Sequence, residues 1–525
     1  MPDINSLDCA RPLGGAVAAH SYSSHPEPDV EDLSGHEEIP GHPLGVKPSG
    51  NALLAAENLR HAIGTFNILP DELILMLLEY LDGPSLLNIG QTCKAFYAFT
   101  RAEDLWKALF TGGLLILVGS WDVALYCLIA SPPASFSWKG TWRSTYLNIP
   151  PSEECILDCS NLFSDVLHRP FHCAHISLDP YIKNIPARNQ IARLPDLSFE
   201  DFNEKWSDTP FILTEPVKQW PAYKNWSVNM LLDHYGEAIF RAEAVDWPLH
   251  TYVDYMHNNS DESPLYLFDR AFVSKMGLKV GQPDQEPDAT YWPPSCFGED
   301  FFSVLGNDRP DRQWLIIGPE RSGSTFHKDP NATSAWNAVV RGSKYWIMFP
   351  SSSKLPPPPG VYVSDDQSEV TSPLSIAEWL FGFHAEARRS PGCIEGICHE
   401  GEILHVPSGW WHLVVNIEPA IAITQNFIPR AHLSAALDFL SNKADQVSGF
   451  RKDVNNPYER FVAQMQKSHP ELLEQAQAEL QKKNEGKKRK WDEIVHGNAE
   501  QDGGDAAEGG GFSFGFGDDS DVEVP

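Results

Sequence analysis

The feature that most constrains the fold of this chain is a series of short apolar segments between residues 312 and 427, each bounded by glycine, proline or serine. Segments of about four to eight residues, rich in β-branched and aromatic side chains, predict strands rather than helices. We expect strands at 312–318, 334–340, 344–349, 402–406, 411–417 and 420–427. Such a set of short strands predicts a double-stranded β-helix whose open end can hold a ligand.

Candidate metal ligands fall within this region. His327 and Asp329 stand one residue apart at the junction between two predicted strands, and His412 begins the strand after a Pro-Ser-Gly turn. Two imidazoles and one carboxylate hold iron(II) on one face and leave the other positions open for a cosubstrate and dioxygen. His399 and His405 are rivals for the third position. We interpret His405 as an ordinary strand residue and favour His412.

Longer strings in and around these strands resemble the JmjC family, and within it the phosphatidylserine-receptor-like branch of arginine demethylases and lysyl hydroxylases. The resemblance covers residues of about 200 to 430. The matching strings follow the family's order: Ser263–Phe268, Gly318–Ser324, His327–Pro330, Thr333–Asn337, Val406–His412 and Ile423–Phe427. The resemblance implies an α+β protein built on a cupin-type double-stranded β-helix, the JmjC jelly roll, with flanking helices.

The resemblance also implies a cofactor and a cosubstrate. It assigns Fe(II) to His327, Asp329 and His412, and it implies that 2-oxoglutarate chelates the metal through its keto acid end. Lys344 occupies the family's position for the cation that pairs with the far carboxylate, which would be a charge-assisted contact. Taken alone, Lys344 is more often an ordinary lysine at the end of a strand.

Four further positions match residues that surround the cosubstrate in the family. Thr424 and Ser324 stand where relatives carry hydroxyl groups, although serine at 324 replaces the expected threonine. Asn337 and Tyr266 match polar positions that line the pocket. The alternative for Thr424 and Asn337 is that they are plain strand residues.

A second resemblance lies near the N-terminus, where residues 66–110 resemble an F-box. The matching strings are Leu69–Leu73, Tyr80–Leu86, Cys93–Phe96 and Leu105-Trp106. Apolar residues at helical spacing predict a small all-α bundle that offers one face to a partner. The resemblance implies docking on the Skp1-type adaptor of cullin ubiquitin ligases, and the alternative is a helical scaffold packed on the catalytic domain.

Composition narrows the class of partner. Forty lysine and arginine residues against 71 aspartate and glutamate residues give a net charge of −31. Such a charge argues against direct nucleic-acid binding and suits basic protein substrates, such as histone tails or arginine-rich splicing factors. Nine irregularly spaced cysteines fit a reducing compartment, and we expect no signal peptide.

We divide the chain into six parts. These are a disordered acidic segment (1–60), the F-box (61–110), a connector (111–199), the JmjC catalytic domain (200–430), C-terminal helices (431–483), and a basic cluster with a disordered acidic tail (484–525). Helices are expected at 430–445 and 457–483, and the resemblance implies that they support a homodimer. The cluster Lys487–Lys490 predicts nuclear localisation; otherwise it is a solvated linker in a cytoplasmic protein.

One segment does not fit the plan. Residues 111–133 are apolar enough to raise the question of a membrane span, but Asp122 lies in the middle, where a charge costs about 2.5 to 3.5 kcal/mol. We therefore expect no membrane association. We interpret the segment as an insertion in the connector and hypothesise that it is translated intron.

The function that fits these observations is an Fe(II)- and 2-oxoglutarate-dependent dioxygenase. It would hydroxylate or demethylate lysine or arginine side chains of basic nuclear proteins. The alternative is a non-catalytic F-box receptor of a ubiquitin ligase that uses the JmjC barrel to recognise proteins. The complete ligand set with Lys344 favours the enzyme, because a pseudoenzyme usually loses at least one ligand.

Overall fold

The computed structural model describes residues 39–112, 137–154, 156–351, 355–364, 369–373 and 375–497. Most of the apolar segment 111–133 and of the predicted disordered ends lies outside these residues, so those predictions stay predictions. Side chains of the basic cluster Lys487–Lys490 also lie outside the description, although their backbone belongs to a helix.

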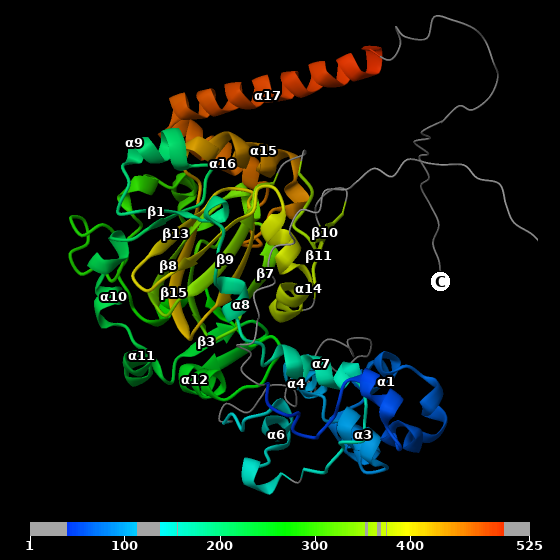
Figure 1. Cartoon of the computed structure of the whole chain (residues 1–525). Helices are drawn as coiled ribbons and strands as arrows, with labels where there is room; N and C mark the ends of the chain where they lie inside the picture. Colours follow the sequence, from blue (N-terminus) through cyan, green and yellow to red (C-terminus); the bar gives the residue numbers. More distant parts are fainter. Residues whose placement is uncertain are drawn as a thin grey trace, which may run out of the picture. The chain divides into compact units, whose positions relative to one another are not determined.

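Two sheets form the barrel, as Figure 1 shows. The smaller sheet has the order β12-β9-β14-β7, with bounds Ile394–Cys398, Lys344–Phe349, Trp411–Asn416 and Gly323–His327. The larger sheet contains the order β13-β8-β15-β6, with bounds Ile403–Val406, Ser334–Arg341, Ala420–Phe427 and Gln313–Gly318. Strands β6 to β9 alternate between the sheets, and so do β12 to β15, which confirms the double-stranded β-helix.

Additional strands widen the larger sheet at both edges. One edge carries β1 and β2, and the other carries β5, β3 and β4. Their bounds are Ala192–Leu194, Phe211–Leu213, Leu267–Asp269, Ile239–Ala242 and Val245–Pro248. A separate pair joins β10 (Tyr362–Val363) to β11 (Val370–Thr371).

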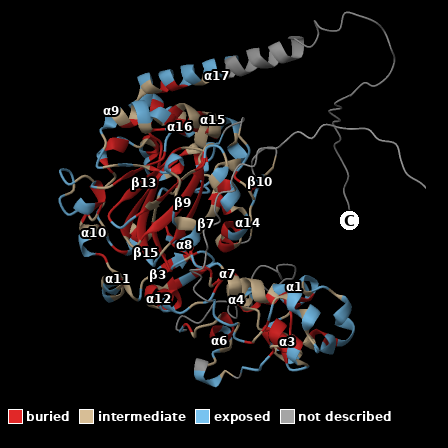
Figure 2. Cartoon of the chain, viewed as in Figure 1, coloured by how far each residue is buried: buried red, intermediate tan, exposed pale blue. Residues whose placement is uncertain are grey.

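The barrel strands form where the sequence is apolar on both faces, because both faces are covered. Every residue of β9, β14 and β15 is buried, and Figure 2 shows the buried colour concentrated on the barrel strands. The expected strands are all present. Two strands of the barrel itself were not expected: β7, which is largely polar, and β12, which carries a glutamate and a glycine.

Helices cover the barrel. Those before and within the catalytic region have the bounds α9 Phe199–Asp201, α10 Pro221–Asn225, α11 Val228–Tyr235, α12 Leu249–His257, α13 Phe272–Lys275 and α14 Ile376–Arg389. Helix α14 packs on the smaller sheet, where Trp379 and Leu380 join Ile347 and Leu413 in one buried cluster. Its N-cap Ser375 accepts a hydrogen bond from the Glu378 backbone N–H, which fixes its first turn.

The C-terminal helices are α15 (Leu433–Asn442), α16 (Pro457–Ser468) and α17 (Pro470–Gly497). The apolar face of the first of them is buried, with Leu433, Leu437 and Leu440 packed against α16 and α17. The single helix expected at 457–483 is wrong in one respect, because the backbone leaves the helix at His469 (φ −140°, ψ 57°). Pro470 follows, and a residue before proline is disfavoured in the α region.

The F-box region forms the expected bundle. Its elements are a 3-10 stretch Leu59–Ile68, then α1 Asp71–Glu79, α2 Gly83–Gly90, α3 Lys94–Phe99 and α4 Glu103–Gly112. Leu105 and Trp106 are buried in its core. The connector adds α6 (Trp142–Leu147), α7 (Asp165–Cys173) and α8 (Asp179–Ile182).

The predicted disorder of residues 1–60 is wrong for its last part. Leu44 and Val46 are buried, and Lys47 forms a parallel bridge with Phe163 beside α7. A 3-10 turn follows at Ser49–Leu54. The segment is rich in proline and glycine on average. That average does not reveal the two apolar residues that anchor the end of the segment.

No single helix among the described residues is long and apolar enough to cross a membrane. One bent pair, Leu59–Ile68 with Asp71–Glu79, passes the test on length and composition alone, with 76° between its two halves.

Candidate active site

The three predicted metal ligands come together at the open end of the barrel. Ligand atoms of His327, Asp329 and His412 all lie within 4.8 Å of one another, and no other such group occurs in the part of the chain that the structure describes. The sheet register explains the meeting, because β7 and β14 are paired with His412 opposite His327. Asp329 follows β7 in the loop before β8. The two imidazole rings are 4.1 Å apart between centroids.

Both histidines are held with one nitrogen available. The Nδ1 atom of His327 lies 2.8 Å from the Thr325 carbonyl oxygen, and that of His412 lies 3.1 Å from the Trp410 carbonyl oxygen. A carbonyl only accepts, so Nδ1 must carry the proton and Nε2 keeps its lone pair. This backbone contact is the arrangement that fixes the tautomer of histidines in metal sites.

Asp329 has one partnered oxygen and one free oxygen. Its Oδ1 accepts from the Asn426 amide at 3.2 Å, and Asn426 also donates to the Thr333 hydroxyl at 3.0 Å. Its Oδ2 is buried and has no hydrogen-bond partner among the described residues. Burial raises the pKa of Asp329, against the opposite influence of His327. A buried carboxylate oxygen without a partner is costly, and a cation bound between the two histidines would satisfy it. The residues therefore fit a metal ion.

Lys344 is fully buried at the start of β9. Its Nζ atom donates to the Tyr266 hydroxyl at 2.8 Å and to the Asn416 side-chain oxygen at 2.6 Å, and no carboxylate of the described chain pairs with it. Burial lowers the pKa of Lys344 to about 7. An ammonium group without a counter-ion in a barrel suits an anionic ligand, such as the far carboxylate of a dicarboxylic acid.

Thr424 and Asn337 face each other across β15 and β8, where they are paired in register. The Thr424 hydroxyl donates to the Trp336 carbonyl oxygen at 2.8 Å, so its oxygen can still accept. The side-chain oxygen of Asn337 is buried and has no hydrogen-bond partner in the described part of the chain. The barrel wall thus contains a second polar atom that a bound ligand can satisfy.

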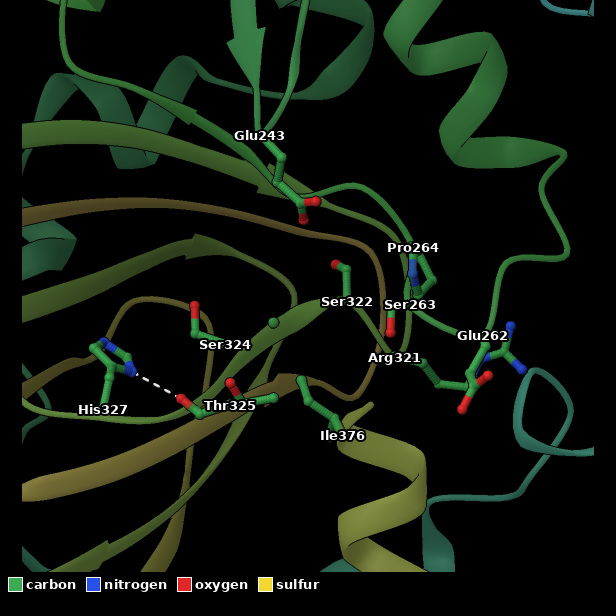
Figure 3. A pocket seen from close by; sticks show the side chains of 11 residues that line it. Glu243, Glu262, Ser263, Pro264, Arg321, Ser322, Ser324, Thr325, His327 and Ile376 are labelled. Atoms are coloured by element: carbon green, nitrogen blue, oxygen red, sulfur yellow. Dashed lines mark hydrogen bonds between the residues drawn. The ribbon is translucent and has the colours of Figure 1, made fainter. Parts of the chain in front are cut away.

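Ser324 lines a cavity of about 410 Å³ that also contains His327. Figure 3 shows Ser324 and His327 near each other at one side of this cavity, with Glu243 above them in this view. Ser322 and Thr325 complete the wall formed by β7 and the turn before it. The structure therefore places Ser324 beside the metal ligands, and Tyr266 at the ammonium of Lys344.

The rival histidines lie elsewhere. His405 is buried on β13, where its Nε2 atom lies 3.2 Å from the Ser207 carbonyl oxygen. Burial lowers its pKa to about 3, as expected for a neutral core histidine. His399 is exposed in the turn between β12 and β13. The reading of His405 as a strand residue is confirmed.

Sequence reasoning missed two amides that complete the site. Asn416 accepts from Lys344 and donates to the Ser322 hydroxyl at 3.0 Å, and Asn426 orients Asp329. Asn426 lies inside a string that matched the family, so it could have been found there. Asn416 is found only through the register, which sets it opposite Lys344.

The fold and the ligand set define a class, namely the cupin-like oxygenases that use a metal held by two histidines and a carboxylate. A Cupin-like domain model matches residues 205–432, and an F-box-like model matches residues 66–111.

Known proteins narrow the class. The chain is 36% identical to the arginine-specific demethylase JMJ22 of Arabidopsis thaliana, over 87% of this chain and 86% of that protein. It is 31% identical to the lysine-specific demethylase JMJ21 of the same plant, over 70% of this chain and 37% of that protein. It is 32% identical to the bifunctional arginine demethylase and lysyl-hydroxylase psr-1 of Caenorhabditis elegans, over 46% of this chain and 62% of that protein.

The chain therefore belongs to the JmjC family of iron- and 2-oxoglutarate-dependent oxygenases, and it carries an F-box-like domain in front of the barrel. The predicted cofactors, iron and 2-oxoglutarate, agree with this membership and with the ligand set in the barrel.

Proposed function

We propose that this protein hydroxylates or demethylates lysine or arginine side chains of basic proteins. One observation carries the proposal: a metal ligand set with free lone pairs lies in the same barrel as a buried lysine that has no counter-ion among the described residues. The names of the relatives support the substrate class, since they include arginine-specific and lysine-specific demethylases and a lysyl-hydroxylase.

Each predicted residue has a role in this proposal. His327, Asp329 and His412 would hold the iron, which with 2-oxoglutarate and dioxygen supplies the oxidant for a C–H bond. Lys344 would bind the far carboxylate of the cosubstrate, helped by the Tyr266 hydroxyl. The remaining polar groups around it, from Thr424, Asn337 and Ser324, would orient the cosubstrate and displace water from the barrel wall.

Two products follow from the same oxidation. Oxygen inserted at a lysine carbon leaves a stable hydroxylysine. Oxygen inserted at an N-methyl group leaves an N-hydroxymethyl group, which releases formaldehyde and the demethylated residue. In either case the substrate side chain would enter the cavity of about 410 Å³ that His327 lines.

The test is succinate production from 2-oxoglutarate by iron-loaded protein with a panel of methylated and unmethylated basic peptides. Peptide-stimulated turnover, together with a product mass increased by one oxygen or decreased by one methyl group, would support the proposal. Stoichiometric iron and 2-oxoglutarate binding with no peptide-stimulated turnover across such a panel would favour a barrel used only for recognition.

We also propose that the F-box binds a Skp1-type adaptor. The observation is an exposed apolar face on α1 and its C-cap residue, formed by Leu73, Met76, Leu77 and Tyr80, and an exposed apolar patch of this kind is typical of a protein interaction site. Capture of purified adaptor by the full chain would test it. Well-folded protein that captures no adaptor would leave the bundle as scaffolding.

Two further parts of the proposal rest on the C-terminal region. The basic cluster Lys487–Lys490 would direct the protein to the nucleus, and imaging of a tagged chain with and without the cluster would test this. Helices α15 to α17 would support a homodimer, and the mass in solution measured by light scattering would test that.

A further inference from the structure

One wall of the active-site cavity comes from the loop between α12 and β5. Glu262, Ser263 and Pro264 of this loop line the cavity that also contains His327, and Figure 3 shows them across the cavity from that histidine. Glu262 is held from outside, since it accepts from Arg169 of α7 at 2.9 Å and from the Ser375 hydroxyl at 2.7 Å. The position of this wall therefore depends on groups outside the barrel.

Asp261, the preceding residue, is an anchor of the same loop. Its carboxylate is buried, with a side-chain exposure of 6%. It accepts from the Trp142 indole N–H at 2.9 Å and from the Tyr255 hydroxyl at 2.8 Å. Trp142 belongs to α6 of the connector and Tyr255 to α12, so the loop is tied to two helices at one residue.

The third donor to Asp261 comes from the F-box. Lys107 on α4 places its Nζ atom 3.1 Å from the Asp261 carboxylate and 3.1 Å from the Ser263 carbonyl oxygen. One ammonium group thus spans the loop from its anchor to a residue of the cavity wall. The Lys107 Nζ atom also lies 5.6 Å from the centre of the Trp142 ring, within the range of a cation–π contact.

The ion pair between Lys107 and Asp261 differs from an exposed surface pair because its carboxylate is buried. Lys107 provides the only ion pair to Asp261 among the residues that the structure describes, and its own side chain is 22% exposed. Exposed pairs contribute little, but removing one partner of a buried pair leaves an uncompensated charge. Without Lys107, the loop would gain by shifting so that the Asp261 carboxylate reaches water.

We propose that Lys107 is a positioning residue for the substrate cavity, so that the F-box holds the wall at residues 261–264 in place. The inference rests on the proposed function in one respect, namely that the peptide substrate enters this cavity. Lys107 does not touch the metal ligands or the cosubstrate pocket. Its effect should therefore appear in substrate binding rather than in the oxidation step.

Lys107→Met in the full chain tests the proposal. The KM for a peptide substrate should rise about tenfold, while the KM for 2-oxoglutarate and the peptide-independent consumption of 2-oxoglutarate stay at the wild-type level. Lys107→Arg, which keeps the charge, should restore most of the peptide KM. The matched control is Lys94→Met, because Lys94 lies on α3 of the same bundle and its Nζ atom donates to the Asp158 carbonyl oxygen at 3.1 Å, away from the loop at residues 261–264.

Amide hydrogen exchange gives a readout that does not need turnover. Faster exchange confined to residues 259–267 in Lys107→Met, and absent from Lys94→Met, would support the proposal even if no peptide is a substrate. Unchanged exchange in this loop, or an unchanged peptide KM, would overturn it. If Lys107→Met does not fold, Lys107→Gln replaces it, and the same two outcomes decide. Failure of the proposed function would appear separately, as wild-type protein without peptide-stimulated turnover.

Discussion

The barrel and the F-box are incomplete in opposite ways. Among the residues that the structure describes, Asp329 Oδ2 and Asn337 Oδ1 of the barrel are buried without hydrogen-bond partners, and the buried ammonium of Lys344 has no counter-ion. The F-box instead leaves large apolar side chains in water, among them Met76 at 50% and Tyr80 at 74% exposure. A buried polar atom without a partner is satisfied by a small polar ligand, whereas an exposed apolar face is covered by another protein surface.

This contrast teaches where each kind of function is built. The barrel positions its groups through strand register, which fixes His327 opposite His412 and Lys344 opposite Asn416. The F-box needs no such precision, because an apolar face recognises a partner through area and shape. Loss of a single atom should therefore be severe in the barrel and modest in the bundle.

The largest effect should come from the metal ligands. His412→Ala should abolish stoichiometric iron binding and reduce succinate production by about a thousandfold or more, since a metal ion contributes several kcal/mol to transition-state stabilisation. Metal analysis and peptide-stimulated turnover would measure it. The control is His399→Ala, which changes an exposed histidine in a nearby turn. Equal losses of iron binding and turnover in both variants would show that His412 is not a specific metal ligand, and the contrast between barrel and F-box would fail.

The next effect concerns Lys344 and pH. Lys344→Met should weaken 2-oxoglutarate binding about a hundredfold, because it removes one partner of a buried charge pair. Burial lowers the pKa of Lys344 to about 7 in the free protein, and the cosubstrate needs the protonated form. Wild-type affinity should therefore fall as pH rises from 7 to 9.

Calorimetry on metal-loaded protein without oxygen would measure both effects. The Lys344→Met variant should show a much flatter dependence over the same range. A wild-type affinity independent of pH would mean that the lysine does not pair with the cosubstrate, and would remove the main reason for calling the barrel incomplete.

A smaller effect is expected at the apolar face. Met76→Glu should weaken adaptor binding by roughly thirtyfold, the usual cost of losing a central interface contact, and should leave the melting temperature unchanged because the side chain is exposed. Surface plasmon resonance with purified adaptor would measure it. Phe381→Glu alters another exposed apolar residue, on α14, and should have no effect. Weakening by both variants to the same degree would point to a general loss of solubility.

The smallest effect is expected at Glu103, a carboxylate that lies outside the barrel. It tests whether a buried charge without a counter-ion always indicates a ligand site. Burial raises the pKa of Glu103, on α4, to about 8, with nearby Asp261 and Glu154 acting in the same direction against a hydrogen bond from the Trp142 backbone N–H. A raised acid pKa favours folding below its unfolded value near 4.5, and this stability is lost as pH rises toward 8.

Glu103→Gln should therefore stabilise the protein on the order of 1–2 kcal/mol at pH 8 and less at pH 5. Thermal unfolding at the two pH values would measure it, with Glu72→Gln on the exposed side of α1 as the control. If the gain in stability of Glu103→Gln does not grow with pH, the ionised Glu103 carboxylate does not destabilise the fold.

Much of the fold was predictable because the signals are local. Apolar strands and their turns identified most of the barrel, and helical spacing with family-like strings identified the F-box. Strand β7 was not predicted, since Gly323–His327 is short and largely polar and pairs only with β14 among the described strands. The burial of Leu44 and Val46 was missed for a similar reason, because two anchors do not change an average composition.

The site was predictable to the extent that it lies in continuous strings. His327, Asp329 and His412 were named from such strings, and the structure brings them together. Asn416 and Lys107 were not, because their meaning lies in pairings over 72 and 154 residues. Register and domain contacts of that kind are three-dimensional facts that no local pattern encodes.

The contacts of Asp261 with Lys107 and Trp142 also bear on the chain segment that connects helices α4 and α6. Helices α4 and α6 are both fastened to this one carboxylate, through Lys107 and Trp142, which stand on either side of residues 113–136 in the chain. The free energy of closing a loop grows only with the logarithm of its length, so several-fold shortening changes it by about 1–2 kcal/mol. Transcripts spliced with and without the apolar segment should both yield folded chains in which Lys107 and Trp142 contact Asp261.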